Sequence, residues 1–367
     1  MIRVLALFLC ILCFGIIQAQ GEDTYQLITP DNAAHLTEVT IVQGTSQFMQ
    51  YQVEFGSLDE RLLISGDFQR DDQNRVVLLN PQVPIARQMN IELFNVRALA
   101  FSPDHSLVSI VGQNNSITVF DIRSLAPLLN LVSQQASEPL FNIAISPNNQ
   151  YLAAAIGAPE RGALATTLFQ VFDILSGDPL FSLDRETTEI DEIFGTGVDF
   201  SRDSEYAYLS TSDGSVYKWQ IASGDHEVIG ENAVRGTRIL VTAFDDQVVY
   251  LTATGFSTIN RTGIREDFLA APNLAEEPWS LMVAITAHPS EPLVAIGYVV
   301  PSETPNTRDS IVQVWDISTG DIRFETVFSE PWPHFLSDLA FNVNGTMLAS
   351  TSSNGTVRVW GVPAANE

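Results

Sequence analysis

The sequence predicts an all-β, single-domain fold in which one four-stranded unit is repeated seven times around a closed ring. Three observations lead to this prediction: a strand-like segment that recurs seven times, a turn signal ahead of each copy, and a spare strand before the first copy. Repetition with a period of roughly 20–50 residues is typical of repeat architectures. With 45% hydrophobic and 17% charged residues, the chain is suited to forming a packed core.

The recurring segment alternates apolar and polar residues and ends in a bulky residue, which in most copies is followed by a polar one. Successive bulky residues lie 41, 52, 47, 40, 56 and 45 positions apart, close to the length of a four-stranded propeller blade. The seven copies are VVLLN (76–80), ITVFD (117–121), FQVFD (169–173), VYKWQ (216–220), FSTIN (256–260), VQVWD (312–316) and VRVWG (357–361).

An apolar strand that ends in a turn precedes each of these segments. The turns contain Pro, Asp, Asn and Gly, which favour turn geometry for different steric and hydrogen-bonding reasons. In three copies the offset from the strand's last aromatic residue to the bulky residue is the same, 19 positions. These pairs are Phe101 with Phe120, Phe200 with Trp219, and Phe341 with Trp360.

With these motifs the chain resembles the WD-repeat β-propeller family, over about residues 36–361. The resemblance is clearest in AFSPDHSLVSIVGQNNSITVFDI and AFNVNGTMLASTSSNGTVRVWGV, which follow the family's turn and strand pattern. It implies a single seven-bladed β-propeller of four-stranded antiparallel blades. The family's Gly-His pair is missing at its usual spacing, and the turn Asp is replaced by Asn114 and Asn354 in two blades. We therefore expect the family's internal Asp–His–Ser–Trp hydrogen-bond network to be incomplete.

Ring closure is predicted from the two ends of the repeats. The chain ends just after the third strand of the last blade, and LTEVTIVQ (36–43) is a spare alternating strand. Pairing of the two would supply the missing fourth strand and cover an exposed sheet edge. We expect a lead-in segment at 22–35, a propeller at 36–362 and a tail at 363–367. ITPDNAAHLTEV resembles the lead-in of some exported bacterial propellers.

Residues 1–21 have the pattern of a secretory signal peptide. Arg3 is followed by an uncharged run from Val4 to Ile17 and by small residues near Gly21. This predicts a secreted or extracytoplasmic protein whose mature chain is not inserted in a membrane; a retained anchor and lipidation are the alternatives. Cys10 and Cys13, the chain's two cysteines, both lie in this segment, so the mature chain would contain no disulfide.

The charge of the chain restricts its partners. Acidic residues number 44 and basic residues 18, which gives a formal net charge of −26. Nucleic-acid binding needs a basic face that displaces phosphate counterions, so this balance disfavours it, together with docking on anionic lipid.

Irregular sequence is predicted to gather on one face of the ring. Three connections between second and third strands carry insertions, at 67–75, 157–166 and 299–309, and they open on the same face as the long links between blades. Loops on a rigid scaffold are where binding usually resides, and Trp and Arg are enriched at interaction hot spots. Packing of the Trp residues beneath their own loops is the alternative. The candidate partner-binding residues are Trp279, Trp332, His334, Phe335, Arg161 and Arg70.

The sequence contains little that points to catalysis. Its five histidines include no pair at metal-ligand spacing, and no GxSxG elbow or Gly-rich phosphate loop is present. Acidic clusters at Asp71-Asp72 and Glu186–Glu192 lack the alternation of a calcium loop. We therefore predict a non-catalytic, protein-binding scaffold without metal or cofactor. The alternatives are a glycan or cell-wall binder that uses exposed Trp residues, and a propeller enzyme or quinoprotein-like module that uses the central channel.

Overall fold

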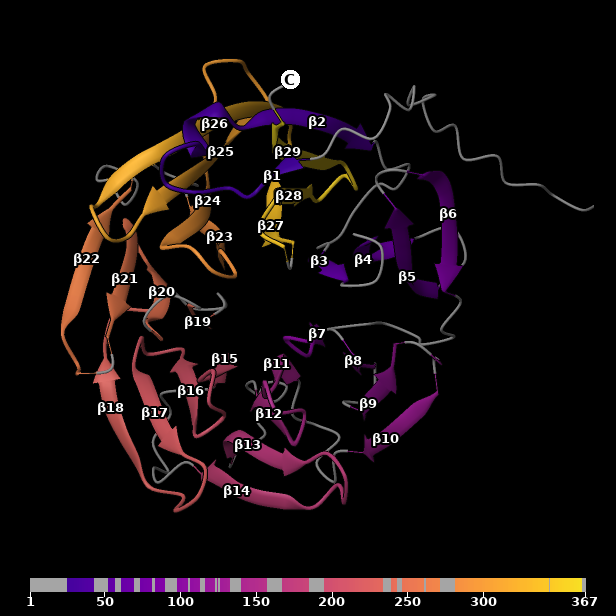
Figure 1. Cartoon of the computed structure of the whole chain (residues 1–367), viewed down its shortest axis with the longest axis vertical. Coiled ribbons are helices and arrows are strands. Elements are labelled where there is room, and N and C mark those ends of the chain that lie inside the picture. Colours follow the sequence, from indigo (N-terminus) through magenta and orange to yellow (C-terminus); the bar gives the residue numbers. More distant parts are fainter. Residues whose placement is uncertain are drawn as a thin grey trace, which may run out of the picture.

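In the computed structural model, the chain forms seven antiparallel sheets that follow one another around a common axis (Figure 1). The predicted seven-bladed, all-β propeller is therefore confirmed. The structure describes residues 25–42, 52–56, 61–68, 73–80, 83–89, 98–104, 106–112, 116–122, 124, 126–132, 140–156, 167–184, 195–233, 239–242, 246–260, 262–270, 281–342 and 344–364.

Six blades are built from four consecutive strands each. Blade 1 holds β3 (Gln52–Gly56), β4 (Arg61–Phe68), β5 (Gln73–Asn80) and β6 (Val83–Met89). Blade 2 holds β7 (Ala98–Phe101), β8 (Leu107–Val111), β9 (Ser116–Asp121) and β10 (Pro127–Val132). Blade 3 holds β11 (Leu140–Ile145), β12 (Tyr151–Ile156), β13 (Thr167–Asp173) and β14 (Pro179–Asp184).

The next three blades repeat this order. Blade 4 holds β15 (Gly195–Phe200), β16 (Tyr206–Thr211), β17 (Val216–Gln220) and β18 (His226–Gly230). Blade 5 holds β19 (Ile239–Val241), β20 (Val248–Thr252), β21 (Gly255–Ile259) and β22 (Arg265–Leu269). Blade 6 holds β23 (Leu281–Ala287), β24 (Leu293–Pro301), β25 (Thr307–Asp316) and β26 (Asp321–Pro331).

The seventh blade joins the two ends of the repeats. It holds β27 (Leu336–Phe341), β28 (Met347–Ser352) and β29 (Val357–Pro363), and strand β2 (Thr37–Val42) pairs with β29 as the missing outer strand. The pairing is antiparallel and places Glu38 opposite Trp360. The predicted closure by an N-terminal strand is thus confirmed. The short strand β1 (Tyr25–Gln26), from the predicted lead-in, extends the same edge at Pro363.

The first strands of the blades form the inner ring. Each contacts the first strand of the next blade, and β27 contacts β3, so the circle is complete (Figure 1). The fourth strands, β6, β10, β14, β18, β22 and β26, lie at the outer rim. Connections between second and third strands therefore open on one face with the links between blades, and the remaining turns open on the other.

Side-chain hydrogen bonds explain the recurring turn signal. In blade 2 the Ser102 hydroxyl donates to Asp104 and accepts from the backbone N–H of Leu107. The same arrangement recurs in blade 3 at Ser146, Asn148 and Tyr151, and in blade 4 at Ser201, Asp203 and Tyr206. The turn residues are needed because a short side chain must satisfy the backbone groups left free at the turn.

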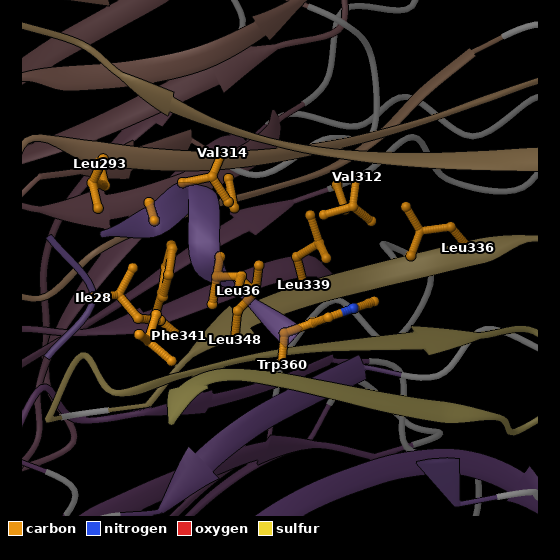
Figure 2. Close-up of a cluster of buried hydrophobic side chains, with 14 of the residues drawn as sticks. Ile28, Leu36, Leu293, Val312, Val314, Leu336, Leu339, Phe341, Leu348 and Trp360 are labelled. Atoms are coloured by element: carbon orange, nitrogen blue, oxygen red, sulfur yellow. The ribbon is translucent and has the colours of Figure 1, made fainter. Parts of the chain in front are cut away.

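The N-terminal segment also contributes to the core between blades 6 and 7. Ile28 is fully buried, and Leu36 follows the short 3₁₀ helix η1 (Ala33–His35). Both pack in a cluster with Phe341, Leu348 and Trp360 (Figure 2). The segment before β2 therefore adds buried apolar area as well as backbone hydrogen bonds.

The WD-type hydrogen-bond network is incomplete, as expected, and one blade replaces it. In blade 4 the indole N–H of Trp219 is buried without a hydrogen-bond partner, while its ring stacks on Phe181 at 4.9 Å. In blade 6 the indole N–H of Trp315 donates to Gln313 at 2.9 Å. Gln313 in turn donates to Tyr298 and Glu325, which gives a different but connected network.

His288 connects the turns of blades 6 and 7. It is 1% exposed, and its Nε2–H donates to the carbonyl oxygen of Gly345 at 2.9 Å. Its Nδ1 accepts from the backbone N–H groups of Ser290 and Glu291, so the ring is neutral with the proton on Nε2. Gly345 has a φ of 65°, and an added Cβ would overlap the imidazole. Burial lowers the pKa of His288 to about 4, although the Gly345 carbonyl opposes this shift.

The closing segment gives a first prediction. Ile28→Ala should lower the free energy of unfolding by about 2–5 kcal/mol, because it leaves a cavity in the core between blades 6 and 7. The matched control is Leu27→Ala, at a neighbouring side chain that is 39% exposed, and we expect a change below about 1 kcal/mol. Urea denaturation measures both variants, and equal losses would contradict the packing role of Ile28.

His288 gives a second prediction. The pKa of His288 is about 4 in the folded chain and 6.5 in the unfolded chain. Protonation therefore favours the unfolded state, so the free energy of unfolding is highest above pH 6.5 and falls as the pH is lowered towards about 4. The pKa shift of His288 corresponds to a loss of roughly 3 kcal/mol in the free energy of unfolding between these two pH values. His288→Asn should be less stable than the parent at pH 7, since it leaves the Gly345 carbonyl unpaired. The gap should shrink as pH is lowered. Denaturation between pH 4 and 7 tests this, and parallel curves would contradict it.

Candidate functional site

Blade 6 contains the longest strands of the described residues, and they continue towards the face that carries the links. Its strands β24, β25 and β26 have 9, 10 and 11 residues. Val300 pairs with Asp309 and Arg308 pairs with Glu330, so the three strands continue side by side. We expected an irregular loop at 299–309, and this expectation was wrong. The inserted residues extend the sheet, and the connection itself is confined to 302–306.

Trp332 lies at the tip of this extension, directly after β26. Its side chain is 54% exposed, and its backbone N–H donates to the carbonyl oxygen of Asn306 at 2.7 Å. The guanidinium carbon of Arg308 lies 4.9 Å from the centre of the indole ring, which is a cation–π contact. The described part of the chain contains no ion pair to Arg308. The tip therefore presents an aromatic face and a cation that no carboxylate of the described residues neutralises.

Two further predicted residues follow in the same turn. His334 is half-buried, and its backbone N–H donates to the carbonyl of Pro331 at 2.9 Å. Phe335 is also half-buried and packs against the core of blades 6 and 7. Its backbone is fixed by two hydrogen bonds to Ser353, at 2.8 and 3.1 Å. Phe335 therefore anchors the turn from below, and Trp332 is the aromatic side chain exposed at the surface.

The other three candidate residues fall outside the described ranges. They are Arg70, Arg161 and Trp279. Their assignment to partner binding stays a prediction, together with the predicted acidic clusters at Asp71-Asp72 and Glu186–Glu192.

A buried carboxylate lies next to the exposed turn. Glu330 is 3% exposed and points between blades 6 and 7, where Asn354 Nδ2 approaches Oε1 at 3.4 Å. Burial raises the pKa of Glu330, and Ser352 and Arg358 offset this only in part by favouring the charged form. Neither the Ser352 hydroxyl nor Glu330 Oε2 makes a well-aligned hydrogen bond.

Carboxylates of the inner strands serve the scaffold. Asp199 on β15 accepts from the backbone N–H of Val241 at 2.8 Å and so connects blade 4 to blade 5. Asp338 on β27 accepts from the N–H of Leu339. Within the described ranges, no group of three or more His, Cys, Asp or Glu side chains has a geometry that could hold a metal ion.

Sequence reasoning identified Trp332 but missed Arg308 and Glu330. Both belong to strands whose alternation continues into the insertion, as in TRDSIVQVWD (307–316) and DIRFETVFSEP (321–331). Following the period-two pattern outward from Trp315 would have placed Arg308 on an extended strand. The proximity of Arg308 to Trp332, 24 positions later in the sequence, depends on the register between β25 and β26.

Comparison with known proteins agrees with this architecture. The family model described as WD domain, G-beta repeat matches residues 327–361, which span the end of β26 and blade 7. A β-propeller domain of Cps50 (Swd1) from Myceliophteria thermophila is similar in structure, with a TM-score of 0.62 and 12% identity. The similarity covers 89% of this chain and 99% of that one. No curated protein matches the sequence.

These findings define the protein as a seven-bladed β-propeller whose last blade carries a WD40 repeat. The resemblance to the WD-repeat propellers is thereby confirmed. This fold is common, since 1513 chains of known structure match it. One fold hosts many functions, so the surface of this molecule, and not its fold, carries the information about function. No helix among the described residues is long and apolar enough to cross a membrane.

Glu330 gives a third prediction. The carboxyl of Glu330 has a higher pKa in the folded chain than in the unfolded chain. Its deprotonation therefore destabilises the folded state, and this loss grows as the pH rises from the ordinary pKa to the raised one. Glu330→Gln stays neutral and should remove this loss. The stability of the variant relative to the parent should therefore be greater at pH 8 than at pH 4. Denaturant midpoints at the two pH values measure the effect, and a relative stability that falls with pH would contradict it.

Proposed function

We propose that this protein is an exported, non-catalytic scaffold that binds a protein partner through the tip of blade 6. The observation that carries this proposal is the half-exposed Trp332 in cation–π contact with Arg308, which forms no ion pair within the described residues. Trp and Arg are enriched among the few residues that supply most of the binding energy of protein interfaces.

The rigidity of the tip supports this role. Trp332 is tied to Asn306 by a backbone hydrogen bond, and Phe335 anchors the turn on the core side. Strands β25 and β26 stay paired up to Pro331. A partner therefore meets a surface that is already ordered, and less conformational entropy is lost on binding than for a free loop.

The charge distribution favours a partner that is not strongly acidic overall. The chain carries a net charge of −26, which repels acidic molecules at long range. At the tip itself, Arg308 offers a local contact for a carboxylate or a backbone carbonyl of the partner. Such a balance fits a neutral or basic protein with a polar group at its contact centre.

The proposed location rests on residues 1–21. A cleaved signal peptide would leave a mature chain without cysteine, stable by virtue of its closed ring and not of disulfides. The mass of the N-terminal peptide of the exported protein tests this proposal, which requires cleavage near Gly21.

The binding proposal gives a fourth prediction. The full mature chain is used as bait in the extracytoplasmic fraction of its own cells, and the captured protein is then titrated against Trp332→Ala and Arg308→Ala. Truncation of a central anchor should weaken binding by about 2 kcal/mol, or roughly 30-fold. The control is Leu175→Ala, at a 96% exposed side chain in the turn between β13 and β14 on the opposite face.

The outcomes separate the proposed functions. Loss of binding with Trp332→Ala and not with Leu175→Ala supports the tip of blade 6. Equal binding by all variants contradicts it. A soluble polysaccharide is added in a parallel titration, and quenching of tryptophan fluorescence that disappears in Trp332→Ala would favour glycan binding instead.

A further inference from the structure

A shallow groove lies at the outer rim, where blade 5 meets blade 6. Its volume is about 650 Å³, and it is widely open to solvent. It lies at the end of β26 opposite to Trp332, so it is separate from the surface in the proposed function. The lining residues are Glu266, Asp267, Phe268, Leu269, Trp315 and Gly320.

One wall of the groove is an edge strand. In the part of the chain that the structure describes, β22 pairs only with β21 and forms the outer edge of blade 5 (Figure 1). An edge strand leaves every second pair of backbone N–H and C=O groups without a strand partner. An extended peptide can satisfy these groups by adding as a further strand.

The floor of the groove is rigid and aromatic. Phe268 stacks on Phe256 at 4.6 Å and meets Trp315 edge to face at 6.1 Å. Leu269 at the end of the strand is 64% exposed. The groove therefore combines an aromatic floor with an exposed apolar side chain at the free strand edge, and an apolar side chain of a bound peptide would pack on Leu269.

The charged groups of the groove are mainly acidic. Asp267 accepts from the Ser257 hydroxyl at 2.5 Å and from Arg265 Nε at 2.7 Å, and these contacts lower its pKa. Glu266 is exposed and forms no ion pair with any residue in the described ranges. Asp321 directly follows Gly320 in the turn at the other wall. Its side chain is 63% exposed and lies 3.8 Å from the guanidinium of Arg323, which also binds Asp316 at 2.6 Å. Carboxylates thus lie on both sides of the strand edge.

We propose that this groove binds an extended, lysine- or arginine-bearing segment of another protein, which adds to blade 5 as a fifth strand. Its cationic side chains contact Glu266 and Asp321, and an apolar side chain packs on Leu269. A second copy of this chain is a poor occupant, because its net charge of −26 repels a like-charged chain.

A synthetic peptide tests the proposal on the intact protein. The probe is a blocked hexapeptide of alternating lysine and valine, titrated by calorimetry at about 0.15 M salt. Its two matched probes are an alternating glutamate and valine peptide, and a lysine–valine peptide with alternate backbone nitrogens methylated on the edge that would face β22. The variant is Glu266→Lys. The control variant is Glu227→Lys, which makes the same charge change at an exposed position of the outer strand β18 of blade 4.

The expected result is binding of the lysine–valine peptide and not of the glutamate–valine peptide. Glu266→Lys should raise the Kd about tenfold more than Glu227→Lys does, because only the former reverses a charge inside the groove. Equal effects of the two variants would show non-specific attraction and overturn the proposal. Undiminished binding of the methylated peptide would overturn strand addition, and absence of binding by the lysine–valine peptide would overturn the site.

Discussion

The pairing of β2 with β29 is the contact on which the rest of the ring depends. Six blades consist of consecutive strands, and only the seventh joins segments more than 300 residues apart. Ile28 and Leu36 pack into the core between blades 6 and 7 just before this strand, so closure combines backbone pairing with apolar burial. With β2 in place, β29 is paired on both sides and blade 7 has four strands like the other blades, which holds the circle without any cross-link.

The junction of blades 6 and 7 concentrates the features that distinguish this propeller. His288 joins the turns on one face, and Glu330 is buried beneath the other, next to the exposed Trp332. Blade 6 also replaces the usual tryptophan network by Gln313 and extends its strands beyond the ring. The extension is part of blade 6, which packs against the closing segment, and this support would hold the proposed binding surface in place at its tip.

The repeats were predictable because their signals are local. The turn of Ser102, Asp104 and Leu107 is formed within six residues, and the alternation around Trp360 requires only neighbouring strands. The closing strand was predictable because the last blade had only three strands in the sequence pattern, and one alternating strand before the first blade had no partner. The arrangement of the candidate site was predicted only in part, and its role in binding stays a prediction. Trp332 was singled out because it lies in a link between blades. Its contact with Arg308 depends on how far the pairing of β25 and β26 continues. The sequence did not indicate this length, because the run before β25 contains two prolines and resembles a loop.

Amide hydrogen exchange of β29 in the intact protein tests the closed ring most directly. The account predicts that the amides of Val357–Val362 exchange as slowly as those of β12, a strand that is paired on both sides within one blade. Slow exchange at β29 requires β2 to be held in place, because without it the outer amides would meet water. Exchange of these amides as fast as that of the free edge of β22 would contradict the account.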